Sequence, residues 1–167
     1  NMEPKAIVYT SNTGHTQKYA FMLGEKTELP VYSLDEAITK LPGGSGVIYL
    51  GWIFANHVKG FSRASKHFSV CAICGVGLSD TGTMISQVRE ATPIPEKIPL
   101  FTLQGGFDRN KLRGINKFMI SMLTKGIASQ KQRTEQNDRM LQLLSQNKSY
   151  VSQDNLKDIL DWYRINK

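Results

Sequence analysis

The hydroxyl-rich segment Ser11–Thr16 has the residue types expected of a site that binds a single phosphate group. It follows a short apolar run and contains one glycine, Gly14, but no Lys or Arg. A turn from a strand into a helix directs backbone N–H groups and the positive end of the helix dipole at an anion, so no cationic side chain is needed. We expect the loop to hold a phosphate through its backbone N–H groups and the hydroxyl groups of Ser11, Thr13 and Thr16. The other residues of the loop, Asn12, Gly14 and His15, are expected to belong to the same binding site.

Two other phosphate-binding patterns do not fit this loop. It lacks the Gly-Lys-Ser/Thr ending of a P-loop, and it does not have the Gly-x-Gly-x-x-Gly spacing of a dinucleotide site. An ordinary helix cap by Ser or Thr would account for one of the three hydroxyl groups, but not for all of them. The loop therefore favours a mononucleotide with one terminal phosphate.

Two segments that follow later apolar runs have residue types that suit the flat ring of a flavin. The first contains large aromatic side chains, of which Trp52 or Phe54 can stack on the ring. The second is rich in glycine and permits close contact between the backbone and the ring edge. The alternative for the aromatic side chains is a place in the core or in an interface. The predicted ring-binding residues are Gly51, Trp52, Ile53, Phe54, Ala55, Gly75, Val76, Gly77 and Leu78.

Apolar runs that alternate with helical patterns predict the elements that position these loops. Strands are expected at residues 5–10, 29–34, 46–51, 68–74 and 99–103, and helices at residues 16–26, 35–41, 59–67, 81–91 and 153–164. Pro30 places the second strand at an edge. The alternation predicts an α/β fold of three layers, in which helices cover both faces of a doubly wound, five-stranded parallel sheet. The expected strand order is 2-1-3-4-5, with FMN bound where the order reverses.

The positive charge of the chain is concentrated in one segment. The formal net charge is +7, and Phe107–Arg133 holds seven Lys or Arg residues but only one acidic residue. We expect a basic helical insertion at about 107–133 within a single domain of residues 3–167. Two alternatives stay open: the helix lies on an anionic membrane surface, or it packs on the domain or on a second subunit of a homo-oligomer. The segment has no nucleic-acid-reading motif, so we expect no nucleic-acid partner.

The cysteine and histidine residues do not indicate a metal site or a disulfide framework. Cys71 and Cys74 lie in one predicted strand, where residues three apart point to opposite faces, so we expect structural thiols. His15, His57 and His67 lack the clustered partners of a metal site. No apolar run is long enough to span a membrane, and no leader peptide is recognisable. We expect a cytoplasmic protein, with any peripheral contact at the inner face of the membrane.

The Ser-x-Thr-Gly-x-Thr pattern of residues 11–16 resembles the phosphate loop of flavodoxins. The closer similarity is to the flavodoxin-like, quinone-dependent protoporphyrinogen dehydrogenases, which also have a basic insertion after the last strand. Here residues 117–120 (Lys-Phe-Met-Ile) and 125–126 (Lys-Gly) resemble that insertion. The resemblance implies FMN as the cofactor, a quinone as the electron acceptor and a tetrapyrrole as a candidate substrate.

These observations favour an FMN-dependent oxidoreductase in which the flavin performs the redox chemistry, so we name no catalytic side chain. A non-enzymatic electron carrier that docks on a redox partner protein through the basic segment is the alternative. A regulatory or structural domain that binds no flavin is a third.

Overall fold

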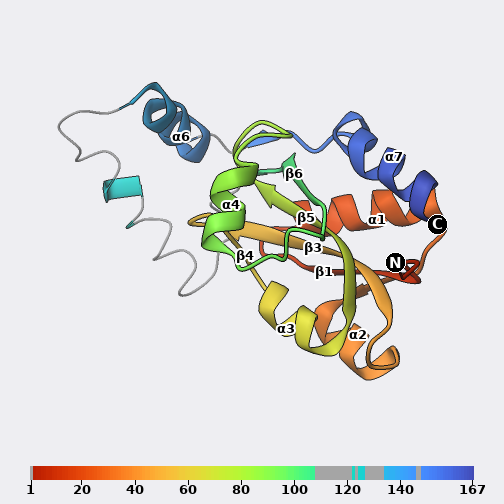
Figure 1. The fold of residues 1–167 in the computed structure, drawn as a ribbon. Coiled ribbons are helices and arrows are strands. Elements are labelled where there is room, and N and C mark those ends of the chain that lie inside the picture. Colours follow the sequence, from red (N-terminus) through yellow and green to blue (C-terminus); the bar gives the residue numbers. More distant parts are fainter. Residues whose placement is uncertain (1, 108–121, 123, 127–133, 146–147) are drawn as a thin grey trace.

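A twisted parallel sheet forms the centre of the molecule (Figure 1). The computed structural model describes residues 2–107, 122, 124–126, 134–145 and 148–167. The parallel strands lie in the order β2-β1-β3-β5-β6, which is 2-1-3-4-5 when these strands alone are counted. The predicted flavodoxin-like layout is confirmed, and β2 lies at an edge as Pro30 predicts. The strands are β1 (Ala6–Thr10), β2 (Val31–Ser33), β3 (Gly46–Phe54), β5 (Ser69–Gly77) and β6 (Leu100–Gln104).

Helices cover both faces of the sheet and bury two apolar clusters against it (Figure 1). One face packs on α1 (His15–Thr27) and α7 (Lys157–Asn166), which contribute side chains such as Tyr19 and Ile159. The other face packs on three short helices, α2 (Leu34–Lys40), α3 (Phe61–His67) and α4 (Ile85–Ala91). This arrangement explains why the strands are continuous apolar runs, since both of their faces are buried.

Two of the predicted loops are wrong, because the strands before them continue further than expected. β3 runs on to Phe54 and turns back into β4 (His57–Val58), which pairs with it in an antiparallel hairpin. The two turn residues, Ala55 and Asn56, both have positive φ angles of 48° and 65°, as a tight two-residue hairpin requires. β5 likewise continues to Gly77. The predicted ring-binding segments are therefore largely strand, and their backbone is fixed by the sheet.

A long connecting segment separates β6 from the C-terminal helices. It begins and ends in a short antiparallel pair, β7 (Gly106–Phe107) and β8 (Lys148–Ser149), and includes α6 (Glu135–Ser145). The expected basic helix at 107–133 lies mostly outside the described residues, and its first residue is in β7. After β8 the chain forms a 3-10 turn, η2 (Gln153–Leu156), and then α7. Among the described residues, no helix has both the length and the apolar character needed to cross a bilayer.

Candidate functional site

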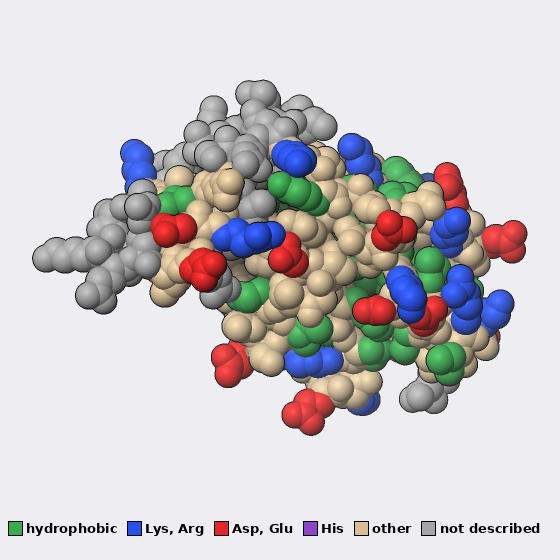
Figure 2. Space-filling model, turned by 90° about the horizontal axis from the view of Figure 1, so that it is seen from above, with side chains coloured by type: hydrophobic (Ala, Val, Ile, Leu, Met, Phe, Trp, Pro, Cys, Tyr) green, Lys and Arg blue, Asp and Glu red, His purple; other side chains and the backbone are tan. Residues whose placement is uncertain are grey.

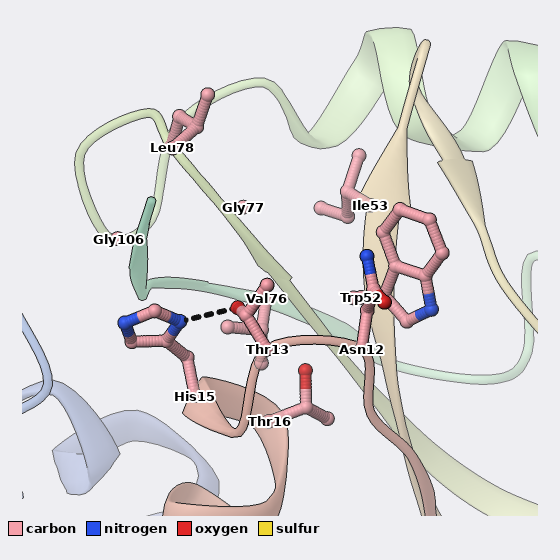
Figure 3. A pocket seen from close by; sticks show the side chains of 10 residues that line it. All are labelled: Asn12, Thr13, His15, Thr16, Trp52, Ile53, Val76, Gly77, Leu78 and Gly106. Atoms are coloured by element: carbon pink, nitrogen blue, oxygen red, sulfur yellow. Dashed lines mark hydrogen bonds between the residues drawn. The ribbon is translucent and has the colours of Figure 1, made fainter. Parts of the chain in front are cut away.

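A pocket lies where the carboxyl ends of β1, β3 and β5 meet the N-terminus of α1 (Figure 3). The strand order reverses at this place, because β1 lies between β2 and β3. In open α/β sheets, ligands bind in the crevice at such a reversal. All of the lining residues except Gly106 belong to the predicted site. The lining consists of Asn12, Thr13, His15, Thr16, Trp52, Ile53, Val76, Gly77, Leu78 and Gly106.

Ser11 caps the first turn of α1 and does not line the pocket. Its Oγ accepts hydrogen bonds from the backbone N–H groups of Gly14, at 3.2 Å, and Gln17, at 3.3 Å. Gly14 is the N-cap residue and has a positive φ of 100°, which glycine adopts at little cost. The Ser11 hydroxyl is therefore engaged with the start of α1, although the N-cap residue is Gly14 and not the Ser or Thr that the helix-cap alternative supposes.

Thr16 is the side chain of the loop that is best placed to meet a ligand. The residue is only 2% exposed, yet its hydroxyl group points into the pocket (Figure 3). Within the described part of the chain this hydroxyl makes no hydrogen bond. No acidic side chain occupies the first turn of α1, so the positive end of the helix dipole is not neutralised there. The N-terminus of α1 thus combines an available donor with a field that attracts anions.

The other threonine of the loop, Thr13, is hydrogen-bonded to the imidazole of His15. The Thr13 hydroxyl lies 2.8 Å from His15 Nδ1, and both side chains line the pocket (Figure 3). This hydrogen bond orients the ring of His15 along the wall formed by Gly106. The loop at residues 11–16 therefore presents an imidazole, held by a hydrogen bond, beside the hydroxyl of Thr16.

The end of β3 forms a second wall of the pocket and carries an aromatic pair with an amine beside it. The rings of Trp52 and Phe54 meet edge to face, with centroids 6.1 Å apart. Lys59 Nζ lies 5.8 Å from the Trp52 ring centroid and 5.7 Å from that of Phe54. Trp52 lines the pocket, whereas Phe54 supports it from outside. Of the two predicted stacking residues, only Trp52 is in a position to contact a ligand there.

Two buried hydroxyl groups fix this wall. Thr92, which is 4% exposed, accepts a hydrogen bond from the Val58 N–H at 3.0 Å and donates one to the Asn56 carbonyl at 3.2 Å. The Tyr49 hydroxyl donates to the Lys59 carbonyl at 2.6 Å and lies 2.8 Å from the Thr10 hydroxyl, directly before the phosphate loop. Burial raises the pKa of Tyr49 to about 12. Tyr49 therefore joins the two walls of the pocket.

Two glycines of the predicted ring-binding segments are closely packed against other residues. A Cβ atom on Gly51 would lie 2.5 Å from the Lys59 carbonyl oxygen, and one on Gly75 would lie 2.8 Å from Ile53 Cδ1. These glycines let the β3–β4 hairpin approach the sheet closely. Ala55 lies in the hairpin turn and is exposed. Gly14, Gly51, Phe54, Ala55 and Gly75 are thus near the pocket without lining it.

Gly106 is the pocket residue that the sequence analysis misses. It follows β6 and is held by a network beneath the pocket, in which the Tyr19 hydroxyl donates to the Gln104 carbonyl and accepts from Asn155 Nδ2 at 2.8 Å. The Tyr150 N–H donates to the Gly105 carbonyl at 2.6 Å. The signal that could have indicated this wall is the glycine pair immediately after the last predicted strand.

The thiols and charges elsewhere add no second chemical centre to the described residues. Cys74 is buried and Cys71 half-buried; both are free, and burial raises the pKa of each thiol. Within the described ranges, no group of three or more metal-ligating side chains occurs. Figure 2 shows basic and acidic side chains intermixed on one face of the molecule. On α7, for example, Asp161 pairs with Lys157 at 2.8 Å and with Arg164 at 3.2 Å.

No family model, no curated protein and no solved structure matches the chain. A function therefore has to be argued from the fold and from the residues of the pocket.

Proposed function

We propose that this protein binds FMN non-covalently in the pocket and acts as an oxidoreductase. One observation carries the proposal: the available hydroxyl of Thr16 and the ring of Trp52 face the same pocket at the reversal of strand order. A phosphate needs hydrogen-bond donors, and a flavin ring needs a flat apolar partner. A hydroxyl donor and an aromatic ring that line the same pocket therefore support FMN as the proposed ligand.

The residues present fit such a cofactor in kind. Thr13, Thr16 and the backbone at the start of α1 would hold the phosphate, with His15 beside them. Trp52 would cover the ring, and the backbone of Gly77 would approach its edge. When bound, FMN supplies the redox chemistry, and the chain contributes binding, orientation and the local electrostatic field.

The proposed reaction transfers electrons from an organic donor to a quinone. The donor loses two electrons and two protons, and the quinone gains two electrons and two protons to become a quinol. A tetrapyrrole of the protoporphyrinogen type is the donor that the sequence resemblance favours. The chain therefore has to hold FMN where a donor and an acceptor can each reach it.

The test begins with retention of the cofactor. Purified protein is incubated with FMN, desalted and examined by absorption spectroscopy, and we expect flavin to elute with the protein. The loaded protein is then assayed for quinone-dependent oxidation of protoporphyrinogen under anaerobic conditions. Flavin retention without turnover would exclude this substrate pair and leave the electron carrier, for which reduction of a partner protein should slow steeply as salt is added.

A further inference from the structure

The described lining residues of the pocket include no acidic side chain. The charges around a pocket determine how strongly it binds a ligand whose own charge changes. The nearest acidic residue after the lining segment of β5 is Asp80, and this carboxylate is paired with Arg139 at 2.6 Å. The pair links α6 to the loop that follows β5 and places a positive charge beside the carboxylate of Asp80. The described surroundings of the pocket are therefore neutral on this side.

The wall at the end of β3 adds a positive charge. The backbone N–H of Lys59 donates to the Trp52 carbonyl at 2.9 Å, so Lys59 is tied to the strand that lines the pocket. Its amine lies near both rings of the aromatic pair, at the distances given above, and forms no ion pair with any described residue. An amine over aromatic rings keeps its charge and is attracted by their π-electrons. Lys59 thus places a cation beside Trp52, which lines the pocket.

Reduction of FMN changes the charge that this environment has to accommodate. Uptake of two electrons and one proton leaves the ring with one more negative charge than the oxidised form has. A site with acidic neighbours would weaken the binding of that form, whereas a neutral site with a nearby cation strengthens it. On the basis of the proposed function, we propose that this pocket binds reduced FMN at least as tightly as oxidised FMN, with Lys59 as a positioned cation that favours the reduced form.

If reduced FMN binds at least as tightly as oxidised FMN, the bound flavin accepts electrons at least as readily as free FMN does. Oxidised, reduced, free and bound flavin form a closed thermodynamic cycle, so the ratio of the two dissociation constants sets the shift of the midpoint potential on binding. A ratio that favours reduced FMN suits an enzyme that takes electrons from an organic donor and passes them to a quinone. A carrier that must deliver electrons at a low potential would need the opposite ratio.

The experiment measures the affinity of the protein for FMN, first oxidised and then reduced with dithionite under anaerobic conditions. If oxidised FMN does not bind, the proposed function fails and this inference falls with it. If oxidised FMN binds and reduced FMN binds more weakly, the proposed function stands and this inference is overturned. The expected result is equal or tighter binding of reduced FMN.

Variants of Lys59 test its part in this preference. Lys59→Gln should weaken the binding of reduced FMN by about threefold while oxidised FMN is affected less, and Lys59→Arg should restore the preference. Lys66→Gln removes an equal charge from the far end of α3 and should change neither affinity. The contribution of Lys59 should also shrink as salt is added. Equal losses for both forms of FMN in Lys59→Gln would show that Lys59 only supports the aromatic pair and would contradict its assigned role.

Discussion

The two walls of the pocket are held in place in different ways. On the phosphate side, the hydrogen bonds join residues close in sequence: Ser11 Oγ bonds partners three and six positions away, and Thr13 bonds a partner two positions away. On the ring side, the bonds of Thr92 and Tyr49 span up to 39 positions. One wall is thus a local motif, and the other exists only when distant parts of the chain have folded together.

This difference predicts that changes to one wall affect ligand binding alone, whereas changes to the other affect ligand binding and stability together. A change on the phosphate wall removes a ligand contact and leaves the fold intact. A change in the bracing of the ring wall lowers the stability of the protein as well, because its hydrogen bonds are also tertiary contacts. The following variants are chosen to separate these effects.

Replacement of the donor on the phosphate wall should have the largest effect. Thr16→Val keeps the shape of the buried side chain but removes its hydroxyl. A hydrogen bond to a charged group contributes about 1.5–3 kcal/mol, so FMN should bind about 10- to 100-fold more weakly. Fluorescence titration with FMN and with riboflavin measures this loss, and riboflavin, which lacks the phosphate, should be unaffected. Thr39→Val on α2 is the matched control, and an equal loss for both flavins would contradict a phosphate contact.

The hydroxyl that joins the two walls should make the protein sensitive to alkaline pH. The pKa of Tyr49 is raised by burial from 10.0 to about 12, so the folded protein holds the phenolic proton more tightly than the unfolded chain does. Stability from this group is fully present below pH 10 and is lost as the pH rises toward 12 and beyond, by about 3 kcal/mol in all. Urea unfolding at intervals across this range should show the loss, and Tyr49→Phe should reduce it. An identical alkaline loss in Tyr49→Phe would assign the effect to another group.

Loss of the Thr92 hydroxyl, which is hydrogen-bonded to the β3–β4 hairpin, should lower the free energy of unfolding by a smaller amount. Thr92→Val leaves the buried N–H of Val58 without its acceptor, which should reduce the free energy of unfolding by about 1–2 kcal/mol. Urea unfolding measures the change, with Thr39→Val again as the control. FMN affinity should fall in parallel, because the hairpin carries Trp52. Unchanged stability would show that the hairpin is held by its strand pairing alone.

The smallest effect is expected from the stacking residue itself. An aromatic contact contributes about 0.5–1.5 kcal/mol beyond its buried area, so loss of the stacking contact in Trp52→Ala should by itself weaken FMN and riboflavin alike by about threefold to tenfold. Phe54→Ala is the comparison, because Phe54 supports the pair without lining the pocket, and its effect should be smaller. A loss confined to FMN in Trp52→Ala would place the phosphate, and not the ring, beside this wall.

The sequence predicts the local structure at residues 11–16 better than that at the end of β3, for the same physical reason. The strand order and both helical layers follow from apolar runs that alternate with helical patterns, and the loop before α1 is recognisable from its hydroxyl groups. The extension of β3 through Phe54 is not, because the hairpin depends on Thr92 and on a turn with two positive φ angles at residues other than glycine. The roles of Gly51 and Gly75 depend on the same hairpin, since their lack of a side chain serves its packing.

The central claim is that one wall of the pocket holds a phosphate and the other holds a flavin ring. Parallel titrations of the unmodified protein with FMN and riboflavin test it most directly, with flavin fluorescence as the readout. The account predicts that both flavins bind and that FMN binds about 10-fold or more tightly than riboflavin, because Thr16 and the start of α1 contact only the phosphate. Equal affinities, or no binding of either flavin, would contradict it.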